Sequence, residues 1–345
     1  MEQYFKKYNI LFLVIILALA VFFRLYQLKT IPPGLYPDEA MNGNNALEAI
    51  RGIPPVGGLF INIQSLSVRI FGNEPWALRI VSAIFGVFTV LGLYFLTREL
   101  FNKESIALLA SFFLATSFWH INFSRIGFQT IMAPFFLVWG LWLVWVLMRK
   151  QNAFLAVLAG FVFGFGFYSY VSYPAIILFL IGPVAMIFAA LGFCWLAEKI
   201  NRPKLIFLIF IFLLTVSINT YKQYFFDWAG NPNVALAFNE NYTLLGNYLK
   251  YSPLDIKKYV IINTENESVQ PVMFLTDTYS AKNQKQKNIY YILPKDLNDF
   301  IIRAKGEENL QIFMLKNDAS LRKKLSDNIP GLFVYENEGI LIQEK

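Results

Sequence analysis

The chain has 345 residues, of which 56% are hydrophobic and 15% are charged, and its formal net charge is +7. Soluble domains have about 45–50% apolar and about 25% charged residues, so this composition excludes a purely soluble protein and predicts an integral membrane protein. With one cysteine and one histidine, the chain alone can build neither a disulfide framework nor a multi-histidine metal site.

Seven apolar stretches approach the length of about 20 residues that a transmembrane helix needs. They cover residues 9–27, 76–97, 105–119, 130–148, 153–170, 175–197 and 204–219. The first follows two lysines, as in a signal peptide, but its apolar run continues through Phe23, so an uncleaved signal anchor is predicted. A shorter and more polar piece, residues 59–72, is expected to form an interfacial or re-entrant helix.

Lysine and arginine in the short loops predict the orientation of the spans. The inner connections would carry Lys and Arg at 6–7, 98–103, 149–150 and 199–204, whereas the outer connections at 120–129 and 168–174 carry only Arg125. We therefore expect a multi-pass protein of the cell (plasma or inner) membrane with a cytoplasmic N-terminus. Residues 28–75 and everything after residue 220 would be extracytoplasmic. This bias also explains part of the net charge without a nucleic-acid partner.

From about residue 221 the composition changes. Residues 234–250 have a helical apolar period, and strand-like runs follow: "KYVIIN", "PVMFLTD", "NIYYIL", "LQIFML" and "LFVYENEGILIQ". Amphipathic pieces such as "KDLNDFIIRA" separate several of them. Strands that alternate with helices predict a small extracytoplasmic α/β domain with a partly parallel sheet over residues 221–345, after a membrane region over residues 1–220.

An acid pair, Asp38 and Glu39, lies just after the first span in "GLYPDEAMNGNNALEAI". One interpretation is a helix N-terminus, because Pro37 suits the first helical position and acids in the first turn favour the helix dipole. The other is catalytic, because a carboxylate at the outer membrane surface can accept a proton from an acceptor hydroxyl. The two interpretations are compatible, since one carboxylate can cap the helix while its neighbour points into a cleft.

Three basic residues lie near the same outer surface. Arg79, a few residues inside the second span, is either a partner in a functional pathway or a side chain that snorkels to the interface. Arg125 could bind a phosphate through two N–H groups. His120 could hydrogen-bond a sugar or phosphate oxygen, or could simply belong to the interfacial belt beside Trp119.

Tyr168, Tyr170 and Tyr173 follow at the next outer turn, where tyrosines form either a sugar-stacking surface or an aromatic belt. No single one of these signals decides the function. Their coincidence on one side of the membrane, together with the acid pair, is the evidence for a site. No metal ligand set is predicted.

Three motifs occur in a fixed order after the anchor: "GLYPDEAMNGNNALEAIRG", "IFGNEPWALRIVSAIFGVFTVLGLYFLTRELF" and "ATSFWHINFSRIGFQTIMAPFF". Through them, residues 8–175 resemble the GT-C superfamily of glycosyltransferases. More narrowly, they are similar to bacterial members of glycosyltransferase family 39, the dolichyl-phosphate-mannose protein mannosyltransferase and aminoarabinose transferase-like group. The acid pair is the most specific of these marks.

The resemblance implies an inverting transfer of a sugar from a polyprenyl-phosphate donor, outside the membrane, to a protein, lipid or cell-envelope glycan acceptor. Asp38 matches the general base of such enzymes, and Glu39 is its neighbour. Arg79 and Arg125 would neutralise the phosphate leaving group. The resemblance implies chemistry that can proceed without a bound metal, and the chain has no Asp-x-Asp motif; a divalent cation stays an open alternative.

Family members usually have more spans than seven. Between "SYVSYPAIILFL" and "IGPVAMIFAALGFCWL" the chain passes from a middle helix to a late one, so it looks shortened in the middle. The alternative function is therefore a non-catalytic, membrane-anchored scaffold or binding protein that acts through its C-terminal α/β domain. A transporter is the weaker choice, because spans three to seven carry no deep charges and no inverted repeat is visible.

Overall fold

The computed structural model of the chain describes residues 6–54, 58–169, 181–198, 202–262, 268–314, 318–337 and 340–345. The chain forms two compact units. The helical unit consists of Met1–Pro32 and Glu48–Val234, and the α/β unit consists of Pro33–Leu47 and Ala235–Lys345. A short segment of the first predicted outer loop therefore folds with the C-terminal part of the chain, although about 190 residues separate the two in sequence.

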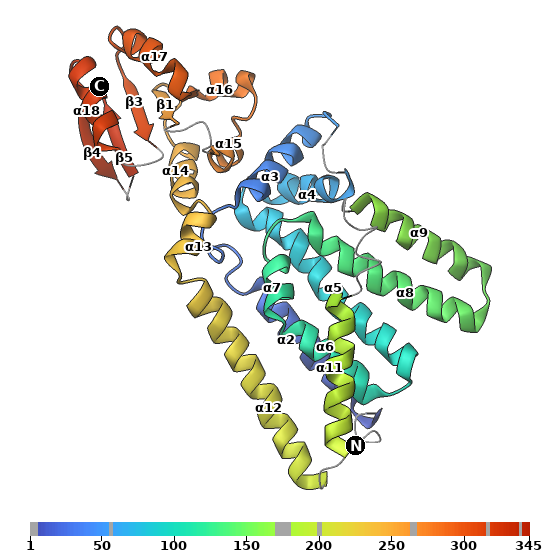
Figure 1. Cartoon of the computed structure of the whole chain (residues 1–345). Coiled ribbons are helices and arrows are strands. Elements are labelled where there is room, and N and C mark those ends of the chain that lie inside the picture. Colours follow the sequence, from blue (N-terminus) through green and yellow to red (C-terminus); the bar gives the residue numbers. More distant parts are fainter. Residues whose placement is uncertain are drawn as a thin grey trace. The chain divides into compact units, whose positions relative to one another are not determined.

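The helical unit is built from the predicted apolar stretches, each of which forms a helix over at least part of its length (Figure 1). Its helices are α2 (Asn9–Leu25), α4 (Gly58–Phe71), α5 (Pro75–Phe101), α6 (Glu104–Ala115), α7 (Phe118–Ser124), α8 (Met132–Lys150), α9 (Ala153–Ser169), α11 (Ile181–Glu198) and α12 (Arg202–Lys222). A 3-10 turn, η1 (Gln129–Ile131), leads into α8, and a π-helical segment, η2 (Gln223–Trp228), extends α12. The core packs α2, α5, α6, α8 and α11 around buried apolar side chains.

Three helical segments in the described part of the chain are long and apolar enough to cross a membrane: Pro75–Phe101, Gln129–Lys150 and Phe207–Trp228. Helices α6 and α7, bent by 60° at a short break, make a fourth if they are one broken span. The other apolar helices have 10–17 residues, and at about 1.5 Å per residue 17 residues extend only about 26 Å. The architecture is that of a helical membrane protein, and the count of seven spans stays a prediction.

Residues 58–71, expected as an interfacial or re-entrant piece, form helix α4. Its buried polar side chains bond to the main chain of its neighbours. Gln64 donates to the carbonyl oxygen of Leu78 at 3.1 Å, and Ser67 donates to that of Ala77 at 2.6 Å. These bonds give carbonyls in the first turn of α5 a second donor and fasten α4 against that helix.

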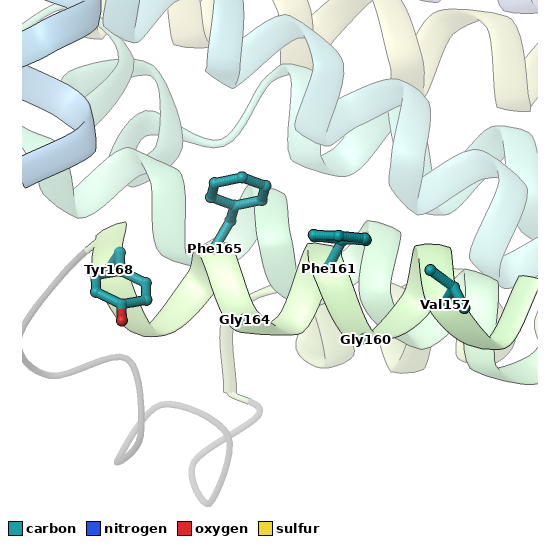
Figure 2. Close-up of a pocket in the computed structure, with 6 residues that line it drawn as sticks. All are labelled: Val157, Gly160, Phe161, Gly164, Phe165 and Tyr168. Carbon is teal, nitrogen blue, oxygen red and sulfur yellow. The ribbon is translucent and has the colours of Figure 1, made fainter.

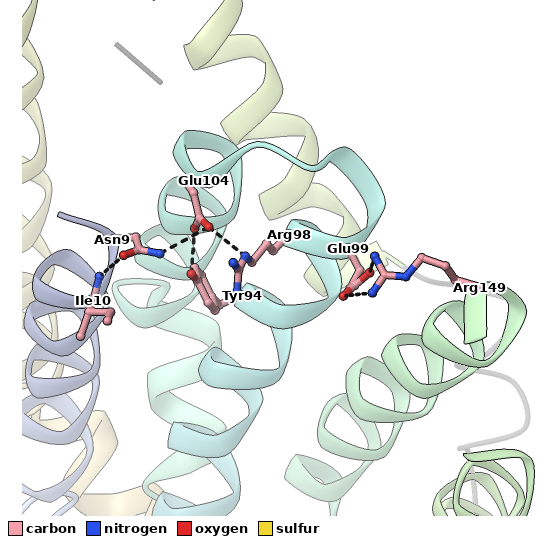
Figure 3. A network of polar contacts seen from close by, with 7 residues as sticks. All are labelled: Asn9, Ile10, Tyr94, Arg98, Glu99, Glu104 and Arg149. Atoms are coloured by element: carbon pink, nitrogen blue, oxygen red, sulfur yellow. Dashed lines mark hydrogen bonds and ion pairs between the residues drawn. The ribbon is translucent and has the colours of Figure 1, made fainter. Parts of the chain in front are cut away.

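At the far end of α5 a buried carboxylate joins three helices (Figure 3). Glu104, the first residue of α6, accepts hydrogen bonds from the Tyr94 hydroxyl at 2.8 Å and from Asn9 Nδ2 of α2 at 3.4 Å. Arg98 Nε lies 2.8 Å from the same carboxylate. This end of α5 is the one that the loop charges predict to be cytoplasmic, and there the polar network holds α2, α5 and α6 together.

The α/β unit contains a five-stranded mixed sheet in the order β2-β1-β3-β5-β4. Strands β1 (Lys257–Ile261), β2 (Ile289–Ile292) and β3 (Leu310–Met314) are parallel, whereas β4 (Phe333–Asn337) and β5 (Ile340–Glu344) form an antiparallel hairpin beside β3. The helices of the unit are α3 (Pro37–Ile50, which continues past the boundary of the unit), α14 (Glu240–Lys250), α15 (Gln270–Thr276), α16 (Ala281–Lys287), α17 (Leu297–Ala304) and α18 (Ala319–Asn328). A short helix, α13 (Pro232–Ala237), precedes α14, and a 3-10 turn, η3 (Pro294–Asp296), precedes α17.

The sheet has an apolar core on each face. One face packs against α14 and α15 through residues such as Leu245, Val272 and Phe313, and the other packs against α17 and α18 through Phe300 and Leu325. Both faces are thus covered by helices, the arrangement expected for parallel strands.

One sequence expectation is wrong. The run "PVMFLTD", expected as a strand, forms helix α15. A short, continuous apolar run does not distinguish a buried strand from a buried helix. Here Pro271 occupies the start of the helix, where its missing N–H costs nothing. Val272 and Phe274 are then buried against neighbouring elements of the unit.

Candidate functional site

The acid pair occupies the first turn of α3, which begins at Pro37 as predicted. The structure separates the two carboxylates: Asp38 is exposed, whereas Glu39 is fully buried. Successive residues of an α-helix point about 100° apart, so two neighbours can face different surroundings. Asp38 is therefore the acid that a molecule in solution can reach directly, and Glu39 belongs to the packed face of the helix.

The main chain just before the acid pair is fixed by α14 within the α/β unit. The Leu35 amide donates to Thr243 Oγ1 at 2.9 Å, and Asn239 Nδ2 donates to the Leu35 carbonyl at 3.4 Å. The Tyr36 ring meets the Phe238 ring edge to face, with the centroids 5.7 Å apart. Two hydrogen bonds and an aromatic contact thus set the path by which the chain enters the helix of the acid pair.

Arg125 and Arg79 are fully buried in the helical unit and bond to the main chain in the last turn of α2 and in the segment that follows it. Arg125 Nη1 donates to the Phe23 carbonyl at 2.9 Å, and Nη2 donates to the carbonyls of Tyr26 and Ile31 at 2.7 and 2.9 Å. Arg79 Nη1 donates to the Pro32 carbonyl at 2.9 Å. The two arginines predicted to bind phosphate therefore organise the segment that leads from α2 toward the acid pair.

The Arg125 guanidinium also lies over two aromatic rings of η2. Its central carbon is 5.4 Å from the centroid of the Tyr224 ring and 4.9 Å from that of Phe225. Arg79 lies nearby, because it and Arg125 donate to the carbonyls of the consecutive residues Pro32 and Ile31. The helical unit thus brings two cations together in buried surroundings, where charge interactions are stronger than in water.

His120 pairs with a residue that the sequence analysis did not single out. Arg24, in the last turn of α2, places Nη2 at 2.7 Å from His120 Nδ1. Because an arginine only donates, Nδ1 must accept and the imidazole proton then lies on Nε2. Among the described residues, His120 Nε2 has no hydrogen-bond partner. The imidazole therefore presents a buried N–H donor.

Arg24 also satisfies the end of α6. Its guanidinium donates to the carbonyls of Leu114 and Ala115 at 3.4 and 3.2 Å, just before the 60° break between α6 and α7. The last carbonyls of a helix have no partner within the helix, and in apolar surroundings each needs one. A charged residue inside the first apolar stretch was the sequence signal for Arg24, because intramembrane arginines are costly and have partners.

Of the three predicted tyrosines, only Tyr168 lies in the described part of the chain; Tyr170 and Tyr173 lie outside it. Tyr168 is exposed in the last turn of α9, at one end of a shallow groove of about 430 Å³ (Figure 2). The groove runs along one face of α9 and is lined by Val157, Gly160, Phe161, Gly164, Phe165 and Tyr168. Its lining is almost entirely apolar and suits hydrocarbon better than a sugar.

In the described parts of the chain, no group of three or more His, Cys, Asp or Glu side chains could hold a metal ion. Among the residues that the sequence singled out, the described polar groups thus include the exposed Asp38 carboxylate, the buried Arg79 and Arg125, and the His120 N–H.

A family model described as dolichyl-phosphate-mannose-protein mannosyltransferase matches residues 53–221. This segment begins after the acid pair and contains Arg79, His120 and Arg125. The chain is also similar to the putative mannosyltransferase YkcB of Bacillus subtilis (strain 168), with 33% identity over 131 residues. These residues are 36% of this chain and 18% of YkcB, so the chain matches less than a fifth of that relative.

Two crystal structures of ArnT from Cupriavidus metallidurans share the fold. The apo structure has a TM-score of 0.52 and the complex with undecaprenyl phosphate has a TM-score of 0.50. In both cases the identity is 10% and the alignment covers 98% of each chain. At this identity the likeness concerns the fold.

Proposed function

Because this chain is a glycosyltransferase family 39-like protein of the GT-C superfamily, we propose that it transfers a sugar from a polyprenyl phosphate to an acceptor hydroxyl. The acceptor is a protein, a lipid or a cell-envelope glycan on the extracytoplasmic side. The observation that carries the proposal is the exposed carboxylate of Asp38 in the first turn of the helix that follows the first apolar segment.

In the proposed reaction, Asp38 accepts the proton of the acceptor hydroxyl while the oxygen of that hydroxyl attacks the anomeric carbon of the sugar. The bond between that carbon and the phosphate oxygen breaks, and the polyprenyl phosphate leaves with the bonding electrons. Attack from the side opposite the leaving group inverts the anomeric configuration. Glu39 is buried, so contact with the acceptor is assigned to Asp38 alone.

The leaving group gains negative charge as the bond breaks, and cations that are already in place stabilise this charge. Arg79 and Arg125 supply two buried positive charges, and the segment that matches the mannosyltransferase family contains both. Three Arg125 donors bond to carbonyls, but a guanidinium has five donors and keeps its charge whatever it contacts. His120 contributes an N–H donor from the same unit. Undecaprenyl phosphate, the ligand bound to ArnT, is the type of carrier that we propose.

The test compares Asp38→Asn with Glu48→Gln, a matched control in the last turn of the same helix. Glu48 forms an ion pair with Arg51 at 2.7 Å. Each full-length variant is reconstituted in liposomes with undecaprenyl-phosphate-linked hexoses and cell-envelope extract, and released undecaprenyl phosphate is measured by mass spectrometry. Removal of a general base should slow release by about 100-fold or more, whereas Glu48→Gln should leave it unchanged.

If the Asp38→Asn variant released undecaprenyl phosphate as fast as the wild type, the assignment of Asp38 as the base would be overturned. If none of the hexoses reacts with the wild-type chain while the full chain captures a partner through its α/β unit, the scaffold function is favoured instead.

A further inference from the structure

We propose that the α/β unit is the positioning element of the acid-pair helix, with Thr243, Phe274 and Gln270 holding α3 so that Asp38 keeps its place. This inference deepens the proposed function and rests on it. It gives the C-terminal part of the chain a role in the reaction through contacts with α3, without requiring it to touch the sugar.

The first contact fixes the entry of α3. Gly34 has φ +81°, a left-handed conformation that favours glycine, and a Cβ there would come 2.3 Å from the Phe238 carbonyl oxygen. The next residue, Leu35, is fully buried, and its amide donates to Thr243 Oγ1 at 2.9 Å. This hydroxyl of α14 thus holds the main chain three residues before Asp38.

The second contact lies one turn beyond the acid pair. Gly43 is inside α3, where glycine is a poor helix former. A Cβ at this position would come 2.6 Å from Cδ2 of the Phe274 ring, which is fully buried in α15. The close approach of α3 to α15 therefore explains the glycine and leaves no room for a side chain at this point.

The third contact is polar and buried. Asn44 Nδ2 donates to Gln270 Oε1 at 2.6 Å and to the Gln270 carbonyl at 3.3 Å, at the start of α15. The Asn44 side chain is fully buried. Because both hydrogen bonds of Asn44 go to Gln270, they fix how α3 is rotated about its axis and how far it is shifted along α15.

Together the three contacts hold the chain at the entry of α3 and at its second turn, and Asp38 lies exposed in the first turn between them. Helices α14 and α15 pack against each other and share an apolar core with the sheet. The position of Asp38 is therefore tied to the core of the α/β unit. A general base acts over hydrogen-bond distances, and a displacement of about 1 Å can cost about 100-fold in rate. A shift of α3 on α15 should thus reduce transfer while leaving the carboxylate itself unchanged.

The docking is tested first without any measurement of activity. In the full chain with Cys194→Ala, the pair Asn44→Cys and Gln270→Cys is treated with a short bifunctional thiol reagent in liposomes. The matched control pairs Asn45→Cys with Gln270→Cys. We expect at least fivefold more cross-linking with position 44 than with position 45, and added Gly43→Ala should remove the difference. Equal cross-linking at 44 and 45 would overturn the proposal.

The role in the reaction is tested by rescue. Gly43→Ala should lower transfer at least tenfold, and Phe274→Ala in the same chain should restore most of it by making room for the new methyl group. Thr243→Ser should retain transfer and Thr243→Val should lose it, because only the former keeps the hydroxyl that accepts from Leu35. Full transfer by Gly43→Ala would refute positioning. If instead the cross-linking is as expected but Asp38→Asn stays active, the docking stands and the assignment of the base falls.

Discussion

Replacement of Arg125 by lysine should destabilise the helical unit although it keeps the positive charge. The guanidinium is fully buried and donates to the carbonyls of Phe23, Tyr26 and Ile31. A lysine has a single ammonium on a shorter reach and lacks the planar fork. We expect it to keep at most one of the three bonds, so that two main-chain carbonyls lose their donor.

A buried polar group left without its partner costs about 1–3 kcal/mol. Two such carbonyls therefore predict a loss of about 2–4 kcal/mol in the free energy of unfolding, because the retained charge over Tyr224 and Phe225 offsets part of the damage. The measurement is unfolding of the full chain in mixed micelles by SDS, followed by tryptophan fluorescence. Because the positive charge is kept, the rate of transfer should fall less than the free energy of unfolding suggests.

The matched control is Arg149→Lys, at the end of α8 (Figure 3). Arg149 forms two contacts with the Glu99 carboxylate, at 2.9 and 3.0 Å, but its side chain is 60% exposed. Exposed ion pairs contribute about 0–1 kcal/mol, so this variant should unfold nearly as the wild type does. An Arg125→Lys variant as stable as Arg149→Lys would refute the idea that the three carbonyls depend on the guanidinium.

Two further predictions concern carboxylates. Glu104→Gln removes the ion pair with Arg98, and the same SDS titration should show a loss of about 1–3 kcal/mol; an unchanged midpoint would contradict the proposed network. Burial raises the pKa of Glu307, but hydrogen bonds from Tyr259 and Lys257 outweigh it and the net pKa is lowered. Its stabilisation is therefore present above the ordinary carboxyl pKa and lost as the pH falls through the lowered value. In thermal melts, Glu307→Gln should have a lower melting temperature than the wild type at pH 7, and this difference should shrink toward pH 3. A difference in melting temperature that does not depend on pH would count against this role of Glu307.

Local patterns predicted the elements well where one principle dominated. Pro37 with two acids predicted a helix start, and α3 begins at that residue. Apolar periodicity predicted helix α4 and the parallel strands of the C-terminal part. It failed at α15, where a short apolar run is compatible with either structure and Pro271 decided for a helix. The orientation in the membrane and the seven spans stay predictions.

The functional residues depended more on long-range packing. The sequence identified Asp38 and Glu39 as a pair, but only the folded chain separates an exposed acid from a buried one. It singled out Arg125 as a cation predicted to lie near the outer surface, but its three carbonyl partners lie about 100 residues earlier. Arg24 is equally plain in the sequence, yet its role at the end of α6 follows only from the contact between α2 and α6.

By itself the sequence determined the class of protein, since composition and apolar runs reflect the solvent in which each segment is stable. It also determined the order of motifs that relates the chain to its family. The tertiary structure decided that α3 folds with residues 235–345 and that Gly43 faces Phe274. No local pattern contains this information, because the free energy of such contacts arises between segments that are about 190 residues apart and meet only when the chain folds.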